Sequence, residues 1–137
     1  MTVNVSPYLS FSGRCAEAFE MYEKVLGGEI VMRMRYRDAP VPSDPAAADQ
    51  IMHICLRIGA HELMGADVPP GHHRPMAGMS VAVALPTADA AHAAFAALSD
   101  GGHVGMPMAE TFWTKAFGMV VDRFGTPWIV SAEMTSN

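Results

Sequence analysis

The sequence contains few cysteines, few basic residues and no long apolar runs. Its 137 residues include two cysteines and 9 Lys and Arg against 14 Asp and Glu, so the net charge is −5. Cys15 and Cys55 lack metal-ligand spacing, and we therefore expect reduced thiols in a cytoplasmic protein. Beyond the alternating Arg33, Arg35 and Arg37 there is no basic cluster, which argues against nucleic-acid binding.

Three further features are missing. No basic segment followed by an apolar region opens the chain, and no apolar run reaches the about 20 residues of a membrane-spanning helix. We therefore expect neither a signal peptide nor a membrane span. No predicted strand leads into a Gly-rich loop for a nucleotide-containing cofactor, and the chain is short for a doubly wound domain. A nucleotide-dependent methyltransferase is accordingly not supported.

What the sequence does contain predicts one α+β domain over residues 1–137. Half of the residues are hydrophobic and 12 are methionine, which suggests a packed core with an adaptable apolar pocket. Strand and helix patterns follow the order β-α-β-β-β twice, in modules of about residues 1–68 and 79–137 joined by the Pro/Gly linker DVPPGHHRPMAG. The predicted helices are 15–26, after an N-cap region at Ser12, and 88–98.

Two β-hairpins are predicted to turn at Gly59-Ala60 and Gly125-Thr126. The first places Arg57 opposite Glu62, Cys55 opposite Met64 and His53 opposite Ala66, all on one face of the sheet. The second, with a two-residue turn, pairs Arg123 with Trp128, Val121 with Val130 and Met119 with Ala132. The side chains predicted to form a pocket wall are His53, Cys55, Met64, Met119, Val121 and Val130.

The loop ETFWTK, before the second hairpin, is unusually aromatic for a connector. Trp113 is expected to stack on a planar or apolar ligand, while Glu110, Thr111 and Lys115 hold its polar end. The alternative is a loop that covers a sheet edge or packs in a dimer interface. Glu62 is explained most simply by a cross-strand pair with Arg57.

The element order and three stretches resemble the vicinal oxygen chelate superfamily of glyoxalases, bleomycin-resistance proteins and dioxygenases. These stretches are PYLSFSGRCAEAFEMYEKVLGG, IMHICLRIGAHELMGAD and MPMAETFWTKAFGMVVDRFGTPWIV, and they look closest to the PhnB-like (3-demethylubiquinone methyltransferase-like) branch. The resemblance implies two βαβββ modules that form a curved mixed sheet around a cavity, and a homodimer. It also implies that Phe11 contributes to the ligand site.

The resemblance permits a test for a metal. Metal-dependent members of the superfamily place one His or Glu from each of four strands around a divalent ion. In this chain those positions fall at Pro7, Met64, Ser80 or Val81, and Val130, none of which is a competent ligand. We therefore expect no cofactor, unless a divalent metal uses other ligands.

Two principal functions remain open at this stage. The first is a metal-independent protein that binds an apolar or aromatic small molecule in the cavity. The second is a lyase-, isomerase- or dioxygenase-like enzyme for a small oxygen-rich substrate, with His53 and Glu110 as acid–base groups. A homodimeric interaction module without a ligand is a third reading.

Overall fold

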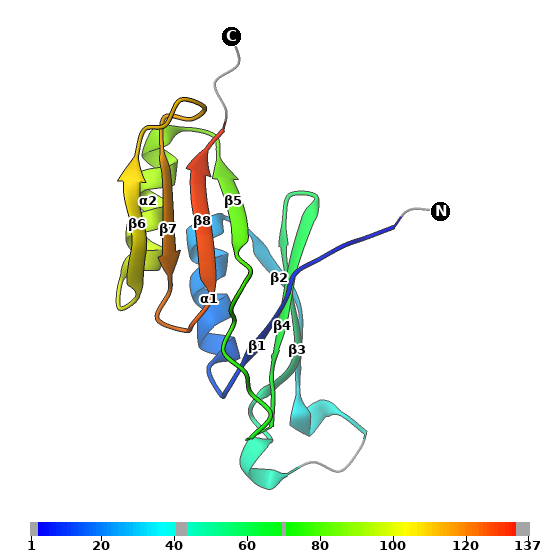
Figure 1. Ribbon diagram of the computed structural model, residues 1–137. Coiled ribbons are helices and arrows are strands. Elements are labelled where there is room, and N and C mark those ends of the chain that lie inside the picture. Colours follow the sequence, from blue (N-terminus) through cyan, green and yellow to red (C-terminus); the bar gives the residue numbers. More distant parts are fainter. Residues whose placement is uncertain (1–2, 41–43, 70, 134–137) are drawn as a thin grey trace. The chain divides into compact units, whose positions relative to one another are not determined.

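The computed structural model describes residues 3–40, 44–69 and 71–133. The chain divides into two compact units, Met1–Arg74 and Pro75–Asn137, and each has its own sheet and its own helix. In the described residues each unit contains one α-helix and four β-strands (Figure 1).

The first unit is a mixed sheet in the order β1-β4-β3-β2, with β1 parallel to β4 and the other pairs antiparallel. Two short 3₁₀ helices, η1 and η2, lie between β2 and β3. The elements are β1 (Tyr8–Phe11), α1 (Cys15–Leu26), β2 (Glu29–Arg35), η1 (Tyr36–Asp38), η2 (Pro45–Ala47), β3 (Ile51–Ile58) and β4 (His61–Asp67).

The second unit repeats this topology in the order β5-β8-β7-β6, again with its first strand parallel to its last. Its elements are β5 (Val81–Leu85), α2 (Ala88–Ser99), β6 (His103–Ala109), β7 (Phe117–Val121) and β8 (Pro127–Ala132). The α+β class and the two βαβββ modules expected from the sequence are therefore confirmed.

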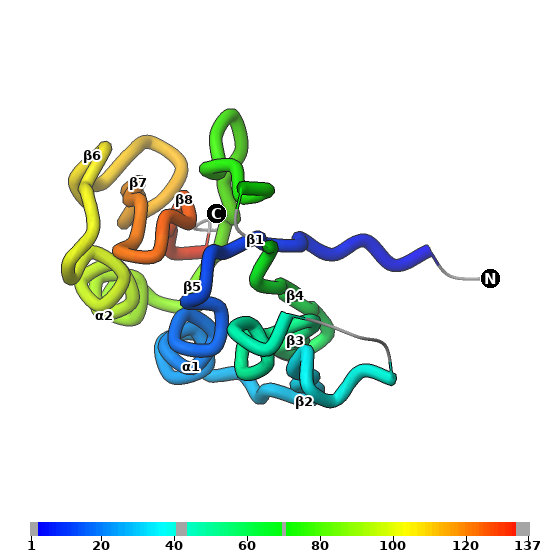
Figure 2. The backbone as a smooth tube through the Cα atoms, turned by 90° about the horizontal axis from the view of Figure 1, so that it is seen from below, coloured from blue at the N-terminus to red at the C-terminus, as the bar shows by residue number. Residues whose placement is uncertain are grey.

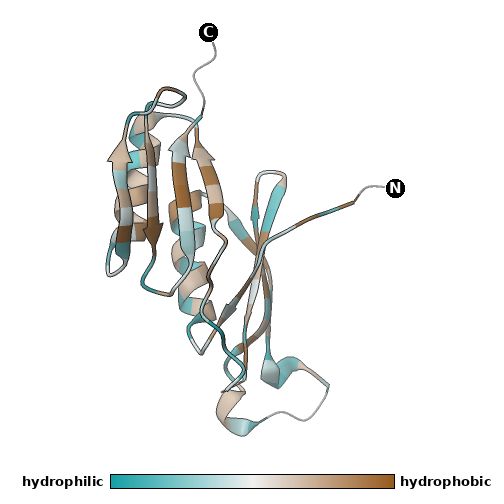
Figure 3. Cartoon of the chain, in the orientation of Figure 1, coloured by the Kyte–Doolittle hydropathy of each residue, from teal (hydrophilic) through white to brown (hydrophobic). Residues whose placement is uncertain are grey.

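Each helix packs on one face of the sheet of its own module (Figure 2). The apolar face of α1 carries Ala18, Phe19 and Tyr22, all fully buried, and Gly27 ends the helix with a φ of 73°. In α2 the buried positions are Ala91, Ala94, Phe95 and Leu98. Hydrophobic residues lie mainly along the strands and the covered helix faces (Figure 3).

In both modules a glycine of the sheet lies beneath a phenylalanine of the helix, although the two glycines stand on different strands of the repeat. A Cβ atom on Gly65 of β4 would lie 2.7 Å from the ring of Phe19, and one on Gly118 of β7 would lie 2.8 Å from the ring of Phe95. Both distances are too short for a real side chain. Each helix therefore approaches its sheet closely only because glycine stands at the crossing point.

The start of α1 is held by a residue distant in sequence. Asp67, at the end of β4, accepts hydrogen bonds at Oδ1 from the backbone N–H groups of Gly13 (2.8 Å) and Cys15 (3.0 Å), and at Oδ2 from that of Ile51 (2.9 Å). The prediction of an N-cap at Ser12 was wrong, because the N-cap is Arg14 and makes no side-chain capping bond. One buried carboxylate thus ties β4, α1 and β3 together.

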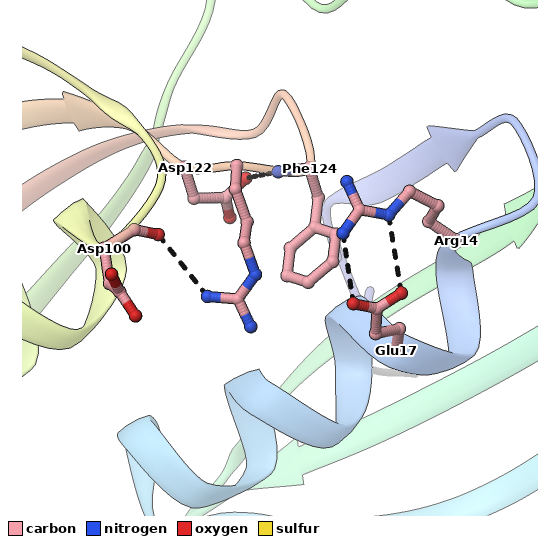
Figure 4. A network of polar contacts seen from close by, with 6 residues as sticks. Arg14, Glu17, Asp100, Asp122 and Phe124 are labelled. Atoms are coloured by element: carbon pink, nitrogen blue, oxygen red, sulfur yellow. Dashed lines mark hydrogen bonds and ion pairs between the residues drawn. The ribbon is translucent and has the colours of Figure 1, made fainter.

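The second hairpin differs from its predicted register. Val120 pairs with Trp128, Met119 with Ile129 and Gly118 with Val130, so the turn is the five-residue segment 122–126 rather than Gly125-Thr126 alone. The carboxylate of Asp122 shapes this turn by accepting the N–H groups of Phe124 and Thr126 and the indole N–H of Trp128, at 2.9, 3.0 and 2.9 Å. Figure 4 shows the bond from the backbone of Phe124 to Asp122.

Candidate functional site

One face of the first sheet packs on α1, and the opposite face carries the chemically active side chains. Ile54, Leu56 and Leu63 point to the helix side and are at most 3 % exposed. We call the other side the open face of the first sheet and define it by Tyr8, Met32, Met34, His53, Cys55, Glu62 and Met64.

The predicted register of the first hairpin is confirmed where the strands pair. Cys55 lies opposite Met64, and Arg57 lies opposite Glu62. The expected ion pair is also present, with Arg57 Nη2 3.4 Å from Glu62 Oε2. Because one slip of register would turn every side chain to the other face, this pairing places His53, Cys55 and Met64 together on the open face.

Tyr8 and His53 form a hydrogen-bonded and stacked pair on this face. Tyr8 Oη lies 3.0 Å from His53 Nδ1, and the two ring centroids are 5.6 Å apart with an interplanar angle of 24°. Partial burial, followed by the neighbouring Cys15 and Tyr36, raises the pKa of the Tyr8 phenol, so it is neutral at physiological pH. The pair fixes the orientation of the imidazole ring.

Sequence reasoning missed Tyr8. Its place at the start of a short strand gave no chemical signal, and its relation to His53 depends on the parallel pairing of β1 with β4. That pairing puts Tyr8 opposite Met64. A parallel pair between the first and last strands of a module cannot be inferred from hairpin spacing.

Cys55 is the most buried polarizable group of the open face, at 6 % exposed. Its Sγ donates to Glu62 Oε2 over 3.5 Å, and Glu62 is held in turn by Arg57. Burial and then the hydrogen bond to Glu62 raise the pKa of the Cys55 thiol, although Arg57 opposes the shift. The thiol is therefore protonated near neutral pH and is a poor nucleophile in this state.

In the second module, the aromatic loop before β7 is anchored rather than loose. Thr111 Oγ1 accepts the backbone N–H groups of Trp113 (3.3 Å) and Thr114 (3.1 Å). Thr114, 2 % exposed, donates its hydroxyl to the carbonyl of Ala132 at 2.7 Å. The loop is thus fastened to the end of β8 and presents its aromatic side chains from a fixed base.

This base supports a cluster of three rings. Trp113 packs edge-on against Phe112 at 4.8 Å and against Phe117 at 5.4 Å between centroids. Phe112 is 97 % exposed and Trp113 is 37 % exposed. Phe117 and Met119 point away from α2, because Gly118 between them faces the helix. Glu110 and Lys115, expected to hold a polar ligand end, are exposed on the same loop.

Two expected pocket residues lie on the helix side instead. Phe11 is 1 % exposed and packs edge-on against Phe19 of α1, so it belongs to the core and we leave it out of the candidate site. Val130 is fully buried, because the five-residue turn shifts the register of β8 by one residue. The open side of β8 carries Ile129 and Ser131 in its place.

The family follows from comparison with known proteins. The model of the glyoxalase/bleomycin resistance protein/dioxygenase superfamily matches residues 5–130, which is nearly the whole described chain. The chain belongs to this superfamily. The identification drawn from its motifs is confirmed.

Individual relatives agree with this assignment. Protein PA1353 from Pseudomonas aeruginosa is 38% identical, and its crystal structure superposes with a TM-score of 0.90 over 98% of this chain and 100% of that one. Protein YjdN of Escherichia coli is 28% identical over 93% of each chain. A PhnB protein from Bacillus cereus, described as a putative 3-demethylubiquinone-9 3-methyltransferase, shares the fold at 24% identity, with a TM-score of 0.80 over 95% of this chain and 99% of that one.

The residues at the superfamily's metal positions do not fit a divalent ion. The strand register changes two of the four metal positions that were assigned from the sequence. On β1 the residue opposite Met64 is Tyr8 rather than Pro7. On β8 the residues that face the open side are Ile129 and Ser131 rather than Val130. None of these offers an imidazole or carboxylate. Across the described ranges, no three His, Cys, Asp or Glu side chains gather as a metal site.

The described helices include none long and apolar enough to span a membrane.

Proposed function

We propose that this protein binds a small apolar or aromatic organic molecule on the open face of its first sheet. The observation that carries the proposal is the Tyr8–His53 pair, in which Tyr8 Oη lies 3.0 Å from His53 Nδ1. Tyr8 is also the strand partner of Met64. A surface of aromatic and thioether groups with a few oriented polar atoms is the usual composition of a small-molecule site. The apolar part of a ligand would cover Met64, and a carbonyl, hydroxyl or carboxylate would meet His53 Nε2 or Tyr8 Oη.

The second module offers a separate aromatic surface, on its anchored loop. Trp113 keeps 37 % of its surface exposed while its ring is fixed against Phe117. A ring held in this way contacts a planar ligand without losing side-chain freedom on binding, which favours affinity. Glu110 and Lys115, on the same loop, would orient a polar substituent.

The test is a thermal-shift screen with phenols, quinones and aromatic carboxylic acids, followed by titration of the compounds that raise the melting temperature. Tyr8→Phe removes one oxygen, and His53→Gln removes the ring while keeping a polar side chain. We expect each to weaken binding about tenfold, which corresponds to about 1.4 kcal/mol. His92→Gln, on the exposed side of α2, is the matched control and should bind like the unchanged protein.

If no compound raises the melting temperature, or if Tyr8→Phe and His53→Gln bind the hits as tightly as His92→Gln, the proposed site is wrong. Quenching of tryptophan fluorescence gives an independent readout. Trp128 is 1 % exposed, so quenching that disappears in Trp113→Phe reports ligand at the loop.

An enzyme is the second candidate, favoured by the way Tyr8 fixes His53. A positioned imidazole is suited to acid–base chemistry on an oxygen-rich substrate. Turnover of a compound from the screen, lost in His53→Gln and kept in His92→Gln, would establish this activity. Binding without turnover would leave the binding function alone.

We also propose a homodimer that works in the cytoplasm and binds its organic ligand without a divalent cofactor. Superfamily membership supports the dimer, and the two free thiols, Cys15 and Cys55, suit a reducing compartment. Sedimentation at micromolar concentration tests the assembly, and a monomer would contradict it.

A further inference from the structure

Three sulfur-containing residues occupy paired positions on neighbouring strands of the first sheet. Cys55 of β3 is directly opposite Met64 of β4 on one side and Met32 of β2 on the other. Side chains paired in this way on antiparallel strands have Cβ atoms about 5 Å apart. One thiol is therefore flanked by two thioethers, each on a neighbouring strand.

The exposure of these residues suits a site with an entrance. Cys55 is 6 % exposed, whereas Met32 is 41 % exposed and Met64 is half-buried. The thiol of Cys55 is thus buried, whereas the flexible side chain of Met32 is accessible to solvent. Methionine has three rotatable side-chain bonds and can turn its sulfur toward a bound ion.

We propose that Cys55, Met32 and Met64 bind a single soft monovalent metal ion, Cu(I) being the biological case. Thiolate and thioether sulfur are the ligands that select Cu(I), whereas Mg²⁺, Ca²⁺ and Mn²⁺ prefer oxygen. The proposal is independent of the organic ligand proposed above, although both would use the same face.

The geometry allows three-coordinate binding. With metal–sulfur bonds of about 2.3 Å, three sulfurs around one ion lie about 4 Å from each other. Met32 and Met64 stand on the two strands that flank Cys55, so their Cβ atoms are about 10 Å apart, and both side chains must extend over Cys55 to bring their sulfurs to one ion. No strand has to move.

The charge balance favours a monovalent ion. On binding, the S–H bond of Cys55 breaks, a sulfur–copper bond forms, and the proton passes to Glu62 Oε2, 3.5 Å away, and then to solvent. The thiolate and Cu(I) together are neutral, so no net charge is placed on this largely apolar face. A divalent ion would leave one uncompensated positive charge there.

The experiment uses reduced, untagged protein under anaerobic conditions, with Cu(I) supplied from a chromophoric chelator of known affinity. We expect one Cu(I) to transfer per chain, detected as loss of the chelator's colour. Cys55→Ser should abolish the transfer, and Met32→Leu and Met64→Leu should each weaken it about tenfold or more. X-ray absorption of the loaded protein should show three sulfur neighbours.

The matched control is Met106→Leu, a methionine of β6 in the second module with a similar exposure of 46 %. It should bind Cu(I) like the unchanged protein, and circular dichroism verifies that every variant is folded. The proposal is overturned if the unchanged protein takes no Cu(I) from the chelator. It is equally overturned if Cys55→Ser still binds, which would assign the ion to Cys15, or if both methionine variants bind normally.

Discussion

Asp67 should contribute more to stability than any single exposed acidic residue. It is 2 % exposed and accepts three backbone N–H groups, from Gly13, Cys15 and Ile51. In Asp67→Asn the amide oxygen can still serve Gly13 and Cys15, but the amide nitrogen would face the N–H of Ile51. One buried donor then loses its acceptor, and two bonds lose the charge that strengthens them.

The magnitude follows from these three bonds. A buried donor left without a partner costs about 1–3 kcal/mol, and a hydrogen bond to a charged group contributes about 1 kcal/mol more than a neutral one. We therefore expect Asp67→Asn to lower the free energy of unfolding by about 3–5 kcal/mol. That loss is a large part of the about 5–15 kcal/mol typical of a folded domain.

Urea unfolding followed by far-UV circular dichroism measures this change. With a slope of about 2 kcal/mol per molar urea, the midpoint should fall by roughly 1.5–2.5 M. Asp44→Asn is the control, because Asp44 accepts one exposed bond, from Ala46, and asparagine caps a helix equally well. A loss below about 1 kcal/mol in Asp67→Asn would refute the three-bond account.

Three further predictions concern the cores of the two modules. Gly118→Ala should lower stability by about 1–3 kcal/mol, because the added Cβ would lie 2.8 Å from the ring of Phe95. The control Gly105→Ala should change stability little, because its Cβ would meet only a carbonyl at 3.8 Å. Thermal unfolding measures both variants. Thr114→Val should cost about 1–3 kcal/mol by the same assay, since the carbonyl of Ala132 loses its hydroxyl donor. Burial and the Asp67 carboxylate raise the pKa of Cys15 above its ordinary 9.0, against a smaller opposing effect of Arg33. Above pH 9.0 the folded protein keeps a proton on Cys15 that the unfolded chain releases, so the free energy of unfolding should fall by up to about 1.4 kcal/mol per pH unit. This pH dependence should be absent in Cys15→Ala. An unchanged pH slope in that variant would contradict the assignment to Cys15.

The architecture could be predicted because short sequence patterns identify each helix and strand. Helix α1 was predicted with the bounds it has, Cys15–Leu26, since its apolar spacing and the glycines after it are both readable. The register of the first hairpin followed from the short turn at Gly59-Ala60. Family motifs then supplied the superfamily, which no single element could identify.

The second hairpin shows where local signals fail. Gly125 has a φ of 97°, as a turn glycine would, but the length of the turn is set by Asp122 and its three donors. The N–H groups that an aspartate accepts cannot be inferred from the sequence alone. The resulting one-residue shift moved Val130 from the expected pocket wall into the core.

The two modules agree on their helix sides and differ on their open sides. On the helix side each has a glycine beneath a phenylalanine, and each also has an aspartate with three hydrogen-bond donors. On the open side both modules present methionines, but the first adds a histidine and a thiol, whereas the second adds three aromatic rings, two on the anchored loop and one at the start of β7. Features that recur in both modules are explained by the packing problem that both must solve. Features found in one module alone have no such explanation, and it is from these that ligand recognition by this protein should be sought.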